Sequence, residues 1–181
     1  MKMALHIAFE KEADSIIKQV VRAFAGPYVH TDMIISQVAP KSVHTAYSSY
    51  MGEGFQRVFQ RDFWFSDHTH DFLFVDVTPE ELQKISETCE ACAESKIMYN
   101  TRDMVLCIVP LRRPREKTLF EAGPLFCSQA MILILRTCLN PEHPLQDSLK
   151  EVHSRTTTPS QLYTVLKSIC PNAARPVWSK K

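Results

Sequence analysis

The stretch EAGPLFCSQAMILILRTCL, residues 121–139, carries the strongest single pattern in the sequence. From Phe126 to Cys138 apolar residues fall on nearly all sides of a helix, which is typical of a helix buried in a protein core. A Gly-Pro turn comes first, and Cys127 stands where Ser or Asp would cap a helix better. The unpaired N–H groups and partial positive charge of a helix start would stabilise a thiolate there. The pattern predicts a buried helix that begins at Cys127. This cysteine is either a nucleophile or a small core residue.

Length and composition limit the kind of protein. The 181 residues, of which 45% are apolar, suit a single domain spanning residues 1–181. Lys and Arg total 21 against 20 for Asp and Glu, so no charge excess points to a nucleic-acid partner. No run approaches the roughly 18 apolar residues of a membrane span. We therefore expect a protein without a membrane segment, in the cytoplasm, the nucleus or a virion. Six scattered cysteines indicate reduced thiols rather than a disulfide framework.

The segments around the cysteine helix predict a small antiparallel sheet and further helices. Strand patterns occupy residues 5–11, 28–37, 42–50, 54–63 and 70–77, and the last is apolar enough for a central strand. Helical patterns occupy residues 14–26, 78–95 and 156–170, while residues 100–111 suit either a helix or a strand. Thr78, Pro79 and Glu81 form a capping box, and Thr158 with Pro159 begins the last helix in a similar way. The fold class is therefore α+β, with an antiparallel sheet packed against the helix that carries Cys127.

Histidines in strand patterns are the candidate partners of a thiolate, which needs a base and usually a group that holds the base. Of the seven histidines, His30 and His44 lie within strands on either side of the link QVAPK. If this hairpin turns symmetrically about Gln37, His30 and His44 lie opposite each other, with Cβ atoms about 4.5 to 5.5 Å apart. A shift by one residue would place them on opposite faces. The pairing predicts that His44 orients the ring of His30.

Alternatives to this third residue stay open. Asp32 is a poor substitute in this interpretation, because it lies about 7 Å from His30 along the same strand. Glu53, in the turn GEG, is the reserve. Tyr28 could line the site or donate to an oxyanion, although a packed aromatic ring suits its position as well. Each histidine could also be an ordinary polar residue of a half-exposed strand.

Other motifs are less specific. The sequence TCEAC spaces Cys89 and Cys92 like half of a zinc knuckle, but no second pair follows, so core packing on a helix is the preferred interpretation. The cluster RRPR at residues 112–115 suits a solvated loop better than an acidic partner. Only four glycines occur, which argues against a phosphate-binding loop. We expect neither a metal ion nor another cofactor.

The order of these elements resembles a known superfamily. A histidine on a strand, a polar residue on the next strand and a cysteine opening a late helix are similar to the circularly permuted papain-like enzymes. This superfamily includes NlpC-like proteins, YiiX-type hydrolases and lecithin:retinol acyltransferase-like enzymes, and the likeness is greatest to its phage and large-DNA-virus members. The segments YVHTDMIIS, VHTAYSSYMGEGFQRV, LFCSQAMILIL and TTTPSQLY carry the resemblance. The Asn-Cys-Glu-His motif of the acyltransferases is absent, since Phe126 precedes Cys127 and Ser128 and Gln129 follow it.

The resemblance implies a permuted papain-like fold and a thiol hydrolase. It assigns Cys127 as nucleophile, His30 as base and His44 as the orienting residue. Acyltransferase-like members also have a histidine in the third position, whereas YiiX-type members more often have a carboxylate. The expected activity is cleavage of an amide or isopeptide bond through an acyl-enzyme, with a protein or peptide substrate that could be ubiquitin-like. A lipid ester hydrolase or acyltransferase, and a non-catalytic virion or binding protein on the same fold, remain the alternatives.

Overall fold

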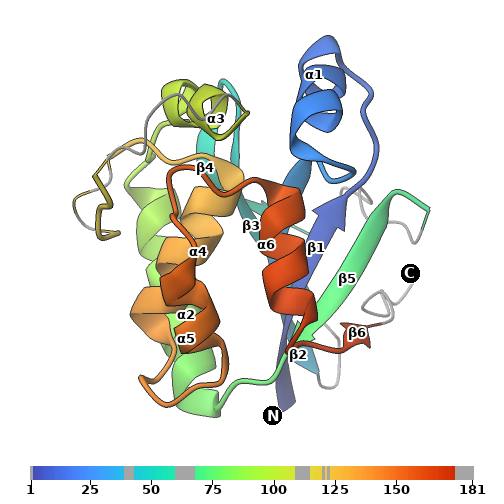
Figure 1. The fold of residues 1–181 in the computed structure, drawn as a ribbon. Coiled ribbons are helices and arrows are strands. Elements are labelled where there is room, and N and C mark those ends of the chain that lie inside the picture. The colour runs from blue at the N-terminus through green and yellow to red at the C-terminus, as the bar shows by residue number, and fades with distance from the viewer. Residues whose placement is uncertain are drawn as a thin grey trace.

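A six-stranded antiparallel sheet forms one layer of the molecule, and helices cover one of its faces (Figure 1). The computed structural model describes residues 2–38, 43–59, 68–108, 115–119, 121 and 123–173. The strand order is β4-β3-β2-β1-β5-β6. The strands are β1 (Lys2–Glu10), β2 (His30–Val38), β3 (Val43–Tyr50), β4 (Gly54–Phe59), β5 (His70–Val75) and β6 (Asn172–Ala173). The helices are α1 (Ile16–Ala25), α2 (Pro79–Glu94), α3 (Thr101–Ile108), α4 (Cys127–Cys138), α5 (Leu145–Glu151) and α6 (Pro159–Lys167). The predicted α+β class is confirmed.

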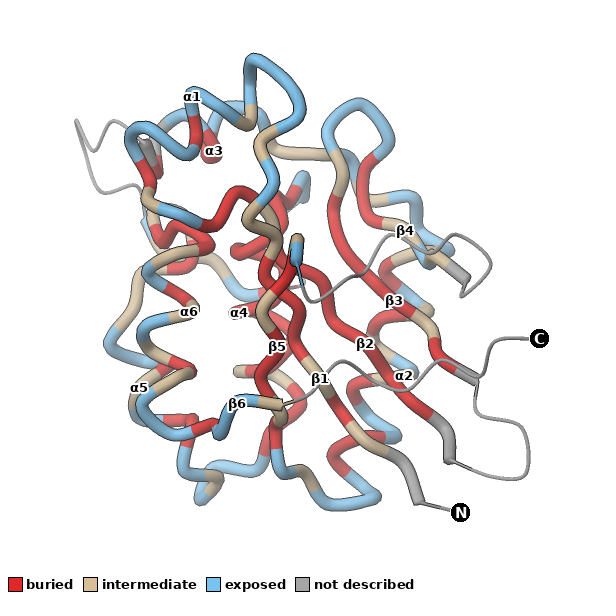
Figure 2. Tube along the Cα trace, turned by 90° about the vertical axis from the view of Figure 1, so that its right-hand side faces the viewer, coloured by how far each residue is buried: buried red, intermediate tan, exposed pale blue. Residues whose placement is uncertain are grey.

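Helices α4 and α2 pack on one face of the sheet. Side chains alternate along each strand, so every second residue faces these helices. Odd-numbered residues such as Ile7, Met33 and Leu73 point toward the helices and form the main core with them. Figure 2 shows this arrangement from the side, with buried chain in both layers. Even-numbered residues point to the opposite face, where Ala8, Ile34, Ala46 and Phe72 make a smaller cluster. Both faces of the sheet therefore bury apolar side chains.

Strand β5 lies inside the sheet, paired with β1 on one side and with the two-residue β6 on the other, while β1 and β2 are the two middle strands. The nearly continuous apolar sequence of β5 reflects its contacts on both faces. Leu73 belongs to the main core on the helix face, and Phe72 belongs to the smaller cluster on the other face. A strand with apolar clusters on both sides needs apolar residues at successive positions whether or not it is central.

Helix boundaries follow their capping residues. Thr78 accepts a hydrogen bond from the Glu81 N–H, the Glu81 carboxylate accepts one from the Thr78 N–H, and the predicted capping box of α2 is confirmed. Thr158 and Gln161 form the same arrangement at α6. The ambiguous stretch at residues 100–111 is helical from Thr101 to Ile108. Helix α5 was not predicted, because its seven residues mix charges without a clear period.

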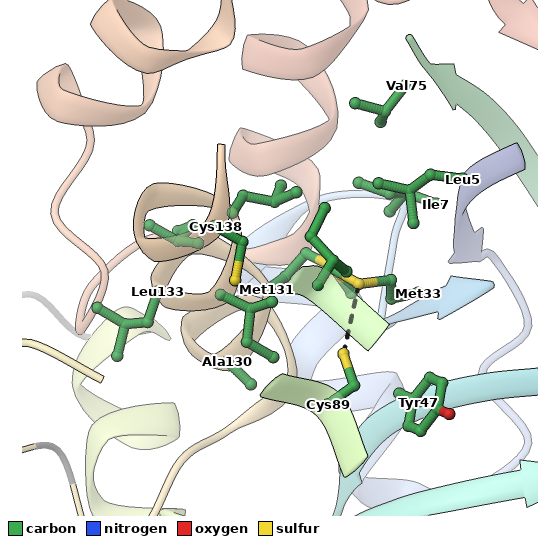
Figure 3. Close-up of a cluster of buried hydrophobic side chains, with 14 of the residues drawn as sticks. Leu5, Ile7, Met33, Tyr47, Val75, Cys89, Ala130, Met131, Leu133 and Cys138 are labelled. Atoms are coloured by element: carbon green, nitrogen blue, oxygen red, sulfur yellow. Dashed lines mark hydrogen bonds between the residues drawn. The ribbon is translucent and has the colours of Figure 1, made fainter. Parts of the chain in front are cut away.

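The cysteines lie in the core. Cys89 packs against Met33, and Cys138 lies close by on α4 (Figure 3). Cys92 belongs to the same cluster, so the core-packing interpretation of the TCEAC segment is confirmed. All six cysteines are free and buried. No helix in the described part of the chain is long and apolar enough to cross a membrane.

Gln129 provides a stability test, because it lies fully buried on α4 and neither its amide nitrogen nor its oxygen has a hydrogen-bond partner among the described residues. An unpaired buried amide costs about 1–3 kcal/mol. We expect Gln129→Met, which keeps the volume and removes the amide, to raise the free energy of unfolding by about 1 kcal/mol. Urea denaturation monitored by circular dichroism measures this.

Gln146 is the matched control. Its amide nitrogen donates to the carbonyl oxygens of Arg136 and Leu139 at 3.1 and 2.8 Å, so Gln146→Met should lower stability by about 1–2 kcal/mol. Equal losses in both variants would contradict the account of Gln129.

Candidate functional site

The candidate site lies at the end of the sheet where β1 ends and β2 begins. Glu10 at the end of β1 pairs with His30 at the start of β2. Helix α4 begins beside this end, and α1 and α3 lie there as well (Figure 1). A groove of about 580 Å³ opens between these elements and is lined by His30, Asp32, Tyr50 and Cys127, among others. The groove gives the nearly buried Cys127 a route to solvent.

Cys127 is the first residue of α4, as the sequence predicts. Phe126 is the N-cap residue of α4. Its backbone is extended, and its side chain makes no capping hydrogen bond. The other residues of α4 are buried except Arg136 and Thr137, which confirms the predicted buried helix. Because no side chain caps the helix, its first N–H groups are available to an anion in the groove.

His30 and Cys127 are brought together as predicted. The thiol and the imidazole both line the groove, and they lie close enough for Cys127 to influence the titration of the His30 ring. Burial opposes the charged ring, but the Asp32 carboxylate and the adjacent Cys127 outweigh it and raise the pKa of His30 well above 6.5. The imidazolium form is therefore favoured at neutral pH, and this cation lies beside the sulfur of Cys127.

Asp32 holds the imidazole ring. One carboxylate oxygen, Oδ1, lies 3.4 Å from the Nε2 atom of His30. The same oxygen accepts a hydrogen bond of 2.5 Å from the Tyr50 hydroxyl. Burial opposes the ionised form, yet the His30 charge and the Tyr50 hydrogen bond keep the pKa of Asp32 below 3.8. The Tyr50 ring also lies against the His30 ring, with centroids 4.8 Å apart and an interplanar angle of 31°.

The expectation that Asp32 is too distant was wrong. Residues two apart on one strand face have Cα atoms about 7 Å apart, but the Asp32 and His30 side chains both extend into the same groove and close most of that gap. The segment HTD already contained this signal, since side chains at i and i+2 share a face. Tyr50 was missed for a different reason, because its position depends on the hairpin register.

The predicted pairing of His30 with His44 was also wrong. Strands β2 and β3 pair with Ser36 opposite His44, so paired residue numbers sum to 80 rather than 74. The strand β2 continues to Val38, beyond the Gln37 position about which the turn was expected. His44 therefore lies six positions from the level of His30, or roughly 20 Å along the strand. Its Nδ1 atom is 2.7 Å from the Ser36 hydroxyl oxygen.

The other two alternatives have separate roles. Glu53 lies exposed in the turn after β3, and its carboxylate accepts a hydrogen bond of 2.7 Å from the Gln56 amide. Tyr28 is a packed aromatic residue, with its ring against Phe9 and Tyr163 and its hydroxyl donating to Asp71 at 2.5 Å. Glu53 lines the groove, but its carboxylate is hydrogen-bonded to Gln56.

Comparisons with known proteins give no assignment: no family model matches the chain, and neither a curated protein nor a solved structure matches it significantly.

Proposed function

We propose that the protein is a cysteine hydrolase in which Cys127 attacks a carbonyl carbon and forms a thioester acyl-enzyme. The observation that carries the proposal is the meeting in one groove of Cys127, at the uncapped start of α4, with His30, whose Nε2 atom lies 3.4 Å from the Asp32 carboxylate. A nucleophile, a base and a group that orients the base meet in one groove, which is the arrangement that thiol catalysis needs.

In the proposed reaction, the proton of Cys127 moves to His30 and the thiolate attacks the substrate carbonyl. The backbone N–H groups at the start of α4 stabilise the oxyanion. His30 then gives the proton to the leaving amine, and the thioester forms. Water attacks the thioester with His30 as base, which releases the acid and regenerates the thiol. Asp32 stabilises the imidazolium during both halves of the reaction.

The permuted papain-like resemblance agrees with this order of residues. The base lies on an early strand and the nucleophile opens a late helix, and Asp32 provides the carboxylate that is more frequent in YiiX-type members. Amide and isopeptide bonds remain the preferred substrates. Lipid ester hydrolysis follows the same chemistry, and the non-catalytic alternative predicts an unreactive Cys127.

Acylation by an activated ester tests the proposal without the natural substrate. We expect p-nitrophenyl acetate to give a burst of nitrophenolate stoichiometric with the protein, with the acetyl group on Cys127 in peptide mass spectra. Cys127→Ala should lack the burst, and Cys107→Ala should keep it, since Cys107 lines the same groove but burial raises the pKa of its thiol to about 12. Acetylation spread over surface lysines, with no burst, would favour the binding-protein alternative.

A further inference from the structure

Helix α1 exposes an apolar stripe that the proposed chemistry does not use. Ile16 and Phe24 are 80% and 70% exposed, and Ile17 and Val20 are each 45% exposed. The helix itself is well formed, because the Ser15 hydroxyl caps it by accepting from a backbone N–H. Its apolar residues follow the spacing predicted from the sequence, but most of them face solvent instead of the core. A contiguous group of large apolar side chains on a surface marks a contact site.

The stripe continues into the groove that contains Cys127. Ile17 is part of the stripe and also lines the groove, together with Val21 on the inner side of α1. Met51, which is 43% exposed in the turn after β3, lines the groove as well. A ligand that extends from the thiol along the groove would therefore reach the stripe.

The groove has an excess of negative charge, which restricts the ligand. Two cations line the groove, the Lys18 ammonium and the His30 imidazolium, against five carboxyl groups, so these side chains leave an excess of three negative charges. The carboxyl groups are those of Glu10, Glu12, Asp14, Asp32 and Glu53. Lys18 is shared between Glu10 and Asp14, at 2.7 and 3.0 Å. Burial lowers the pKa of His70 to about 4, so this groove residue adds no charge at neutral pH.

We propose that the stripe and the groove together bind an extended segment of a protein substrate in which apolar residues alternate with lysines or arginines. The inference rests on the proposed function, because it places the scissile bond of that segment at Cys127. Apolar side chains would cover Ile16 and Phe24, and the cations would meet the carboxylates of Glu12 and Glu53.

Two other occupants fit this surface less well. A helix that binds an anionic membrane carries a row of lysines and arginines beside its apolar face. Helix α1 has two cations, Lys18 and Arg22, and Lys18 is already paired with Glu10 and Asp14. A second copy of the chain, paired through the same face, would bring two acidic grooves together. A polypeptide with basic and apolar side chains fits both the acidic groove and the apolar stripe without repulsion between like charges.

Peptide binding to the Cys127→Ala protein tests the inference separately from the chemistry, since no cleavage is needed. Fluorescence anisotropy would compare three fluorescein-labelled peptides of twelve residues, alternating Leu with Lys, Leu with Glu, and Ser with Lys. We expect the Leu-Lys peptide to bind at least about tenfold more tightly than either of the others, and more weakly as salt is raised. Equal affinities for the three peptides would overturn the proposal while leaving the acylation test of Cys127 unaffected.

Surface variants then locate the binding site. The double change Ile16→Ser and Phe24→Ser should weaken binding of the Leu-Lys peptide about tenfold, and Glu12→Lys with Glu53→Lys should weaken it by a similar factor. The controls are Ile169→Ser and Glu142→Lys, at exposed positions outside the groove, which should change affinity less than about twofold. Control variants that weaken binding as much as the stripe variants would contradict the assigned surface.

Vesicles and sedimentation distinguish the rejected occupants. The proposal predicts no binding to vesicles of phosphatidylcholine with phosphatidylserine, and no concentration-dependent dimer in sedimentation equilibrium. Vesicle binding or dimerisation that is lost in the Ile16→Ser, Phe24→Ser double variant would assign the stripe to a membrane or to a second copy and overturn the proposal.

Discussion

Replacing Cys127 or His30 with alanine is expected to lower turnover of any substrate by at least about a thousandfold, because nucleophile and base act as one unit. The double variant should be no slower than either single variant, since removal of one partner already leaves the other without a role. The measurement is kcat/KM for the four proteins on a panel of amide, isopeptide and ester substrates.

Stability must be measured alongside activity in the His30 variant. Removal of the imidazole leaves the buried Asp32 carboxylate with the Tyr50 hydroxyl as its hydrogen-bond donor among the described residues, and we expect this loss to cost about 3–5 kcal/mol. His30→Gln, which can still donate a hydrogen bond to Asp32, is therefore the companion variant. If the folded His30→Gln protein or the Cys127→Ala protein retained parental turnover, the assignment of the pair would be wrong.

Asp32→Asn is expected to lower kcat by about a hundredfold to ten-thousandfold with a smaller effect on KM, because an amide neither fixes the correct tautomer of His30 nor stabilises its charged form. The pH profile gives a second signature. The Asp32 charge raises the pKa of His30, so its loss lowers that pKa, and the imidazolium is lost at lower pH. The alkaline limb of the activity profile should therefore move to lower pH in the variant.

His44→Asn is the matched comparison, since His44 is also a buried histidine on the sheet but contacts Ser36 instead of His30. This change should leave kcat within about twofold of the parent at temperatures where the protein is folded. A large loss of activity in His44→Asn with normal activity in Asp32→Asn would restore the third residue that the sequence-based hypothesis favoured.

The cysteine helix and the placement of His30 on a strand were predictable from sequence because they depend on local patterns. The apolar residues of α4 occupy all of its sides, so burial of the helix and the position of Cys127 at its start follow directly. His30 was selected because an imidazole in a strand needs a polar partner. The capping box of α2 was equally local.

The third site residue was not predictable because it depends on hairpin register. A turn placed three residues too early moved His44 opposite His30, although the true pairing puts Ser36 opposite His44. The loop residues 39–42 lie outside the described residues, and their sequence gave no strong turn signal such as Asn-Gly. An even shift in register keeps every side chain on its predicted face, so the alternation of β3 could not reveal the error.

The amphipathic pattern of α1 shows a second limit. Its apolar spacing predicts a helix, and the helix forms, but periodicity does not state whether the apolar face meets the core or an external partner. Val21 and Ala25 are buried, while Ile16 and Phe24 face solvent. Only the tertiary arrangement distinguishes these cases.

The rate of alkylation at each cysteine tests the central claim most directly. Burial raises the pKa of the other five thiols, to about 11 for Cys92 and Cys170 and about 12 for Cys107, and also raises it for Cys89 and Cys138. At pH 7 we expect iodoacetamide to modify Cys127 at least about a hundredfold faster than any of them, as followed by peptide mass spectrometry. His30→Ala should slow the reaction of Cys127 at least about tenfold and leave the others unchanged. A Cys127 rate within a few-fold of the other five, or one that does not depend on His30, would show an ordinary structural cysteine.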